Sequence, residues 1–191
     1  HNGEPSALEI LPAQRPEGII FEDSSEKRLK VSPQNLYREM NLGTFFKKDG
    51  VEIFVTEHLL AALASFGIYH AYIKVSQREL PILKGNSIDF VNEIKKTGLN
   101  FFEHVQPQIV LNKKIRVEKD KSYIEAFPAE HLEINATIVY SHTPIGTQTL
   151  KYLDSQETFE SELAWARTFG PIKELEHLRS QDRAMGASLE N

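Results

Sequence analysis

Two segments in the first hundred residues have the apolar spacing of an amphipathic helix. The first carries a stripe made of Leu59, Leu60, Leu63 and Phe66. Gly67 follows and suits the left-handed conformation that often ends a helix. The hydroxyl of Thr56 is expected to accept a backbone N–H of the first turn. The pattern therefore predicts a helix with Glu57 and His58 in its first turn.

The second segment begins after Asn86 or Ser87, either of which can cap a helix. Its apolar stripe consists of Phe90, Val91 and Ile94. Lys95 and Lys96 stand near its C-terminal end, where the helix dipole favours cations, and Gly98 follows them. We therefore expect a second amphipathic helix here.

Around these helices the pattern changes to the two-residue period of strands. Residues 71–75 alternate apolar and polar side chains, as in a strand with one buried face. Residues 51–55 predict a short strand that runs into the first helix. Residues 7–21 alternate loosely around two prolines and a glycine, which predicts a β-hairpin.

A second set of strands is expected after residues 103–108, where Pro107 interrupts the chain. Its predicted strands are 109–111, 115–117, 123–127 and 132–140. Helical stripes follow at positions 159, 163 and 166, and at 172, 175 and 178. This order indicates an α+β fold with two similar domains, each a β-sheet layer packed with two helices. We place the first domain at residues 1–106 and the second, incomplete one at residues 107–191.

The composition is that of an ordinary globular chain, with 40% hydrophobic and 26% charged residues. A net charge of −5 gives no electrostatic footprint for nucleic acid or an anionic membrane surface. We expect no nucleic-acid partner, and transient contact with a membrane surface stays open but is not indicated. Cysteine is absent, which excludes thiolate metal sites and disulfides within the chain. No apolar run is long enough to span a membrane, and the first residues lack a signal-peptide pattern. We expect a cytoplasmic protein; nothing in the sequence indicates its oligomeric state.

The adjacent Glu57 and His58 are the most informative chemical feature. Neutral imidazole is the commonest zinc ligand, and a carboxylate beside a zinc site can take a proton from an attacking water. A glutamate in the first turn is also favoured by the helix dipole alone, and a single histidine often has only a structural role. The dipeptide by itself leaves both interpretations open.

The surrounding segments resemble those of one family, the zinc-dependent UDP-3-O-acyl-N-acetylglucosamine deacetylases. Residues 55–64, Val-Thr-Glu-His-Leu-Leu-Ala-Ala-Leu-Ala, are similar to its Thr-Val-Glu-His-Leu-x-x-Ala-Leu motif. Residues 79–87 resemble its Glu-Ile-Pro-Ile-x-Asp-Gly-Ser segment, and residues 166–170 match its Ala-Arg-Thr-Phe-Gly motif. Residues 186–191, Gly-Ala-Ser-Leu-Glu-Asn, resemble the family's Gly-Gly-Ser-Leu-Glu-Asn segment. Residues 1–3, His-Asn-Gly, resemble its Leu-His-Ser/Thr-Gly start, and residues 42–44 match its Leu-Gly-Thr. Each match is weak alone, but their ordered set is specific and extends over the whole chain.

The resemblance implies hydrolysis of the acetamide of a UDP-linked, acylated amino sugar, the committed step of lipid A biosynthesis. Glu57 matches the general base, His58 a zinc ligand and Thr168 the hydroxyl that stabilises the oxyanion. Phe169, Gly186 and His1 are the expected substrate contacts, the first two along the passage of the acyl chain. Zn²⁺ is the implied cofactor.

The resemblance also implies ligands that these residues do not supply. In the family, a His and an Asp four residues apart on a later helix complete the zinc site, and a further catalytic His follows. No histidine from His58 onward has an aspartate four residues later. We therefore expect a truncated chain whose 191 residues are inactive by themselves.

Several positions depart from the family pattern. Lys84 stands where the family has an acidic residue, Pro171 replaces an aromatic residue, and Asp182 and Ala187 replace glycines. These changes leave a second hypothesis open, a non-catalytic remnant that binds a nucleotide sugar or an acyl chain. A third is a longer bifunctional chain, since this family is sometimes fused to an acyl-carrier-protein dehydratase.

Overall fold

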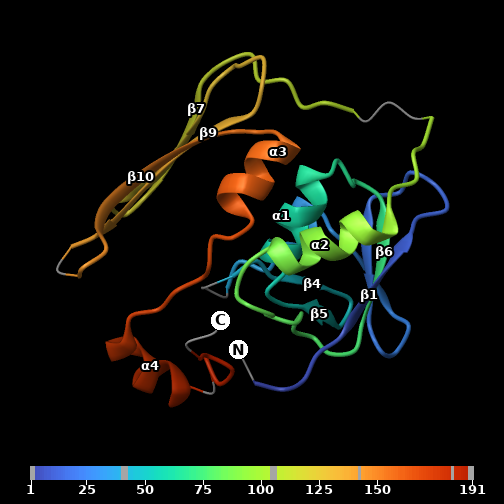
Figure 1. The fold of residues 1–191 in the computed structure, drawn as a ribbon, viewed down its shortest axis with the longest axis horizontal. Helices are drawn as coiled ribbons and strands as arrows, with labels where there is room; N and C mark the ends of the chain where they lie inside the picture. The colour runs from blue at the N-terminus through green and yellow to red at the C-terminus, as the bar shows by residue number, and fades with distance from the viewer. Residues whose placement is uncertain (1–2, 40–42, 104–106, 142, 182, 189–191) are drawn as a thin grey trace. The chain divides into compact units, whose positions relative to one another are not determined.

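The computed structural model describes residues 3–39, 43–103, 107–141, 143–181 and 183–188, and its fold is mixed α+β. Its contacts divide the chain into two units (Figure 1). Unit 1 comprises His1–Phe102 together with Glu160–Asn191, and unit 2 comprises Glu103–Phe159. The break after Phe102 lies close to the boundary expected from the sequence. Residues 160–191, which the sequence pattern places with the second domain, make their contacts with unit 1 instead.

Unit 1 is built on a four-stranded sheet. In spatial order its strands are β1 (Leu8–Pro12), β6 (Ala71–Val75), β2 (Ile19–Glu22) and β3 (Arg28–Lys30). β6 pairs antiparallel with β1 and parallel with β2, so the hairpin expected over residues 7–21 was wrong. Alternation identifies strands but not their neighbours, and the buried face of β6 gains more cross-strand pairs at the centre of a sheet.

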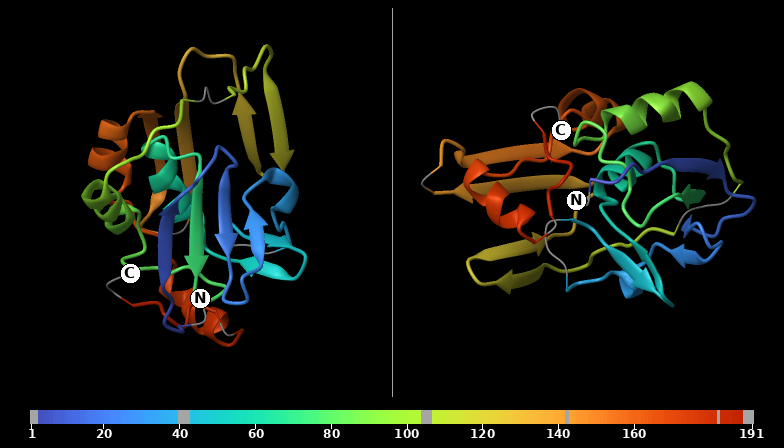
Figure 2. Two further views of the ribbon diagram at one scale, coloured as in Figure 1. Left: turned by 90° about the vertical axis from the view of Figure 1, so that its right-hand side faces the viewer. Right: turned by 90° about the horizontal axis from the view of Figure 1, so that it is seen from below.

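Helices α1 (Glu57–Ser65) and α2 (Ile88–Thr97) pack against each other on one side of this sheet (Figure 2). Their buried residues include Leu59, Leu63, Val91 and Ile94, as the apolar stripes predicted. Gly67 follows α1 at φ +65°, which agrees with the left-handed residue expected there. Gly98 follows α2 at φ +75° and ψ −177°, a conformation open almost only to glycine. Apolar burial on one face of each helix therefore fixes α1 against the sheet.

A short hairpin leads into α1. Its strands are β4 (Phe46–Lys48) and β5 (Val51–Ile53), and the short 3₁₀ helix η1 (Pro33–Asn35) precedes them. The Phe45 side chain is 1% exposed and meets the ring of Phe54 edge to face, with 5.3 Å between centroids. The hairpin is therefore anchored in the core of unit 1 directly before the first turn of α1.

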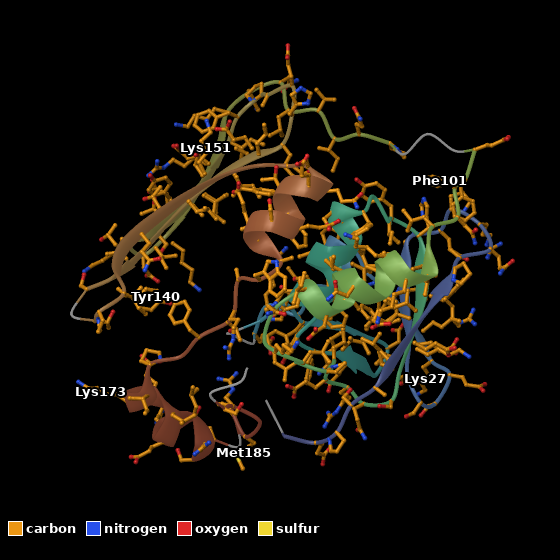
Figure 3. All side chains as sticks on the ribbon, viewed as in Figure 1. Lys27, Phe101, Tyr140, Lys151, Lys173 and Met185 are labelled. Atoms are coloured by element: carbon orange, nitrogen blue, oxygen red, sulfur yellow. The ribbon has the colours of Figure 1, made fainter. Side chains whose placement is uncertain are left out.

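The remainder of unit 1 follows a π-helical turn, η2 (Phe159–Leu163), and contains α4 (Ile172–Arg179). The stripe predicted at 172, 175 and 178 lies in α4, which has no buried residue. The chain returns to the start of unit 1 near its end: a Cβ built on Gly3 would lie 3.1 Å from that of Met185 (Figure 3). Within the residues that the structure describes, no helix has the length and apolar content needed to cross a membrane.

Unit 2 consists mainly of two separate hairpins and ends with the short α3 (Gln156–Thr158). β7 (Ile115–Lys119) pairs with β8 (Ser122–Ala126), and β9 (Glu133–Tyr140) pairs with β10 (Gly146–Leu153). The sequence predicts three of these strands but not β10, and residues 109–111 form no strand. Each hairpin has one apolar face, which in β9 and β10 consists of Ile134, Ala136, Ile138, Tyr140, Leu150 and Tyr152. Most of these side chains remain exposed.

Candidate functional site

Glu57 and His58 occupy the first two positions of α1, as the sequence predicted. Thr56 stands at the N-cap position, but its hydroxyl caps no helical N–H. It donates instead to the carbonyl oxygen of Thr44, at 3.0 Å, and the Thr56 amide donates to the same oxygen at 3.1 Å. The predicted cap was therefore wrong, because a tertiary acceptor takes the hydroxyl.

The carboxylate of Glu57 is held by the same residue that binds Thr56. The backbone N–H of Thr44 donates to Oε2 of Glu57 at 2.8 Å. The other oxygen, Oε1, lies beside Gly43, where an added Cβ would approach it to 3.4 Å. Glu57 is half-buried, so its carboxylate has a fixed orientation in a partly desolvated place.

The backbone that leads to this pair has an unusual conformation. Val55 has φ +59° and is 6% exposed. A β-branched residue is sterically disfavoured in this region, and such a conformation costs of order 1–3 kcal/mol. Bonds on both sides hold it: the Phe54 amide donates to the Arg78 carbonyl at 2.7 Å, and Thr56 is bound to Thr44. The turn at Val55 therefore sets the direction in which Glu57 and His58 leave the hairpin.

The imidazole of His58 is half-buried. Burial lowers the pKa of His58 from its ordinary value, and the neighbouring Glu57 carboxylate opposes this shift. The balance favours the neutral ring, which is the form that binds a metal ion. The backbone carbonyl of His58 accepts a hydrogen bond from the Ser87 hydroxyl at 2.9 Å.

Residues 85–87 connect His58 to Thr168. The Thr168 amide donates to the Gly85 carbonyl at 2.8 Å, and the Ser87 amide donates to the Ala164 carbonyl at 3.1 Å. The Ser87 hydroxyl also donates to the His58 carbonyl. Gly85 therefore binds Thr168 while Ser87, two residues later, binds His58. Two peptide units span at most about 7 Å, which brings the backbones of His58 and Thr168 into the same region of unit 1.

The expected substrate contacts are placed less fully. Phe169 follows Thr168 directly and is 54% exposed. Gly186 lies next to Gly3, since a Cβ added to Gly186 would be 3.6 Å from the Gly3 Cα. His1 lies outside the described residues, as does Asp182. Phe169 is thus adjacent to Thr168, while Gly186 neighbours the start of the chain.

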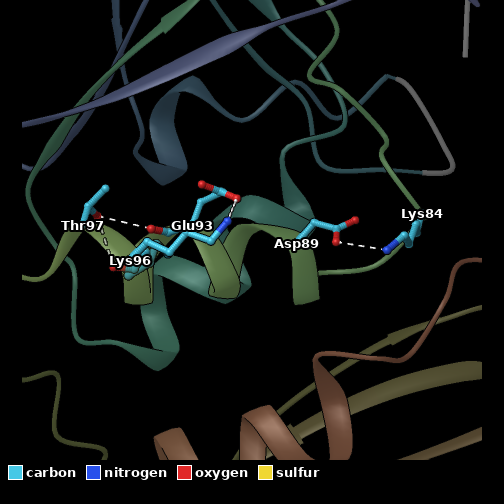
Figure 4. Close-up of polar contacts among 6 residues, drawn as sticks. Lys84, Asp89, Glu93, Lys96 and Thr97 are labelled. Carbon is cyan, nitrogen blue, oxygen red and sulfur yellow. Dashed lines mark hydrogen bonds and ion pairs between the residues drawn. The ribbon is translucent and has the colours of Figure 1, made fainter.

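Lys84, the reversed charge in the family segment, has a partner of its own. Its ammonium lies 3.4 Å from Oδ1 of Asp89, in the first turn of α2 (Figure 4). The Lys84 side chain is exposed and that of Asp89 is partly exposed, and such pairs contribute little to stability. The Lys84 charge is therefore paired with the Asp89 carboxylate.

A zinc site can be built only partly from these residues. Neutral His58 fits as one ligand, and Glu57 beside it fits a base. Within the described part of the chain, no group of three His, Cys, Asp or Glu side chains could hold a metal ion. A catalytic zinc requires three protein ligands and an open position, so the described residues do not complete such a site.

Sequence reasoning assigned no role to two residues that organise this region. Thr44 lies in the Leu-Gly-Thr segment, but its contacts are made by backbone atoms, which a residue pattern does not reveal. Ser87 was interpreted only as a possible helix cap. Two signals were present, its position at the start of an amphipathic helix and its place at the end of the segment 79–87.

The whole chain matches the model of one deacetylase family. The family model described as LpxC: UDP-3-O-acyl N-acetylglycosamine deacetylase matches residues 1–191, and the chain belongs to this family.

Individual relatives agree with this assignment. The UDP-3-O-acyl-N-acetylglucosamine deacetylase of Syntrophus aciditrophicus (strain SB) is 32% identical over 194 residues, which cover 100% of this chain and 61% of that protein. The proteins of the same name from Campylobacter hominis and Nautilia profundicola are 31% and 32% identical over 192 residues. These matches cover 100% of this chain and 65% of each of those two proteins. The chain thus spans less than two thirds of the length of these relatives.

Proposed function

We propose that the protein containing this chain is a zinc-dependent amidohydrolase. Its substrate is a UDP-3-O-acyl-N-acetylglucosamine, and its products are the free amine and acetate, in lipid A biosynthesis. The observation that carries this proposal is the Glu57–His58 pair, whose carboxylate is oriented by Thr44 and whose imidazole favours the neutral form. Membership of the deacetylase family supports the substrate class.

In this proposal, His58 supplies one zinc ligand, and residues outside the described ones supply the others. Bound zinc would acidify a water and polarise the acetamide carbonyl. Glu57 takes the proton of the attacking water and can return it to the leaving amine. The Thr168 hydroxyl donates a hydrogen bond to the oxyanion that develops on the carbonyl oxygen. Phe169, Gly186 and His1 contact the substrate.

The role of Thr168 leads to a specific prediction. Thr168→Val should lower kcat about 10²-fold, because one oxyanion donor is lost while the bond from the residue-168 amide to Gly85 persists. Thr168→Ser retains a hydroxyl and serves as the control, with a kcat within several-fold of the parent. Steady-state kinetics decide the matter, and an unchanged kcat in the valine variant would remove Thr168 from the mechanism.

The proposal as a whole is tested by metal content and acetate release. We expect the product of the complete reading frame to contain about one zinc per chain by elemental analysis and to release acetate from the substrate. Removing the zinc with a chelator should abolish turnover, and adding it back should restore turnover. The 191-residue chain alone should hold zinc weakly and release no acetate.

The second hypothesis, a non-catalytic remnant, predicts a different result. The complete product would then bind the nucleotide sugar without releasing acetate, whatever its zinc content. Isothermal titration with the substrate, followed by an acetate assay on the same sample, separates the two hypotheses.

A further inference from the structure

Thr44 makes three hydrogen bonds to the start of α1, all through its backbone. Its N–H donates to Oε2 of Glu57 at 2.8 Å, and its carbonyl oxygen accepts from the Thr56 amide and hydroxyl at 3.1 and 3.0 Å. Thr44 therefore contacts both Thr56, directly before the helix, and the carboxylate of Glu57, the first residue of the helix. We call this set of three bonds the Thr44 contact.

The Thr44 contact is attached to the core of unit 1. The next residue, Phe45, is buried against Phe54, and its carbonyl accepts a hydrogen bond from the Tyr37 amide at 2.8 Å. On the other side, Val55 is held in its left-handed conformation between bonded neighbours. The backbone is thus fixed both at Thr44 and at the start of α1. The Thr44 amide therefore holds the Glu57 carboxylate in one orientation, and the amide does not move to suit the carboxylate.

Gly43 supplies an independent observation beside the other carboxylate oxygen. Its φ is not among the left-handed values of the chain, so backbone conformation does not require a glycine there. A Cβ at this position would lie 2.9 Å from the Phe45 ring and 3.4 Å from Oε1 of Glu57. A side chain here would press on the Phe45 ring and lie in contact with Oε1, and the Thr44 bond to the carboxylate is made through Oε2.

From these contacts we infer that the Thr44 backbone amide is the positioning group of the Glu57 base, and that Oε1 is the oxygen that receives the proton. The inference rests on the proposed function, since it assigns a part within that reaction. An oriented base lowers the cost of reaching the reactive geometry, which matters for turnover more than for substrate binding.

The first test needs no turnover. In the ¹⁵N-labelled product of the complete reading frame, the Thr44 amide should exchange slowly with solvent. Glu57→Ala should speed that exchange at least about tenfold, because its acceptor is gone. Glu52→Ala, which removes a partly exposed carboxylate from the neighbouring strand, is the matched control and should leave the exchange unchanged. Equal exchange in all three proteins would overturn the inference.

The second test removes the amide itself. Replacing the residue-44 amide with an ester, by incorporation of the α-hydroxy analogue of threonine, deletes the N–H and retains the side chain. We expect kcat to fall about 10- to 100-fold, with KM within threefold and zinc content unchanged. The same analogue placed at Thr147, in β10 of unit 2, is the matched control and should retain the parent kcat within threefold, because that residue has no part in the proposed mechanism.

The outcomes separate this inference from the proposed function. An ester protein with the parent kcat, or one that changes only in KM, would overturn the positioning role. If the unmodified protein released no acetate, the proposed function would fail, and amide exchange would still decide the Thr44–Glu57 contact. If the ester protein did not fold, amide exchange in the Glu57→Ala variant would decide alone.

Discussion

Glu57→Gln is expected to lower kcat of the complete protein by about 10²- to 10⁴-fold, the range contributed by a positioned general base. Glutamine has nearly the shape of glutamate, and its carbonyl oxygen can still accept the Thr44 N–H. What it loses is the ability to take a proton. Zinc content should remain unchanged, because His58 is intact. The measurements are steady-state kinetics and elemental analysis on the same preparation.

The control for this prediction is Glu52→Gln on the neighbouring strand β5. Glu52 forms ion pairs with Lys47 at 2.6 Å and Arg78 at 2.9 Å, and its carboxylate has no part in the proposed reaction. Its turnover should stay within about twofold of the parent, since exposed ion pairs contribute little. Near-normal turnover in Glu57→Gln would mean that another group is the base.

Phe21→Ala should destabilise unit 1 by about 3–5 kcal/mol, the usual cost of emptying a buried aromatic position. Phe21 lies in β2, pairs with Ile73 and Leu29 across the sheet, and is 0% exposed. Because whole domains are stable by only about 5–15 kcal/mol, this loss removes a large share of the total. The free energy of unfolding by urea denaturation, followed by circular dichroism, measures it.

The chain offers the same substitution at an exposed position. Phe101 is 88% exposed, so Phe101→Ala should change the unfolding free energy by no more than about 0.5 kcal/mol. A comparable loss in both variants would show that the destabilisation does not come from burial. A loss below about 1 kcal/mol in Phe21→Ala would contradict the central position of β2.

Local signals in the sequence were sufficient for the elements that place the site. The apolar stripes predicted α1 and α2, Gly67 after α1 takes the expected positive φ, and β6 alternates as its sequence indicated. Each of these signals depends on residues within a few positions of one another. The position of Glu57 and His58 at the start of a helix was predicted for the same reason, while their chemical roles stay predictions.

Features that depend on distant partners could not be predicted in this way. The Thr56 and Ser87 hydroxyls stand at cap positions, yet they donate to the carbonyls of Thr44 and His58. Nothing near either residue reveals that such an acceptor is available. The order of β1, β6 and β2 and the left-handed Val55 likewise follow from packing across the sheet and hairpin, and a β-branched residue is a poor signal for that conformation.

The two hairpins of unit 2 have a consequence for anyone who handles these 191 residues alone. Each sheet has two strands among the described residues, so each of the strands β7–β10 has one side on which no described strand pairs with it. Such edges, joined to exposed apolar faces, are templates for intermolecular strand pairing. Concentrated solutions of the isolated chain should therefore form β-rich aggregates before the core of unit 1 unfolds. Low solubility of the chain would then not mean that the region around Glu57 and His58 is unfolded.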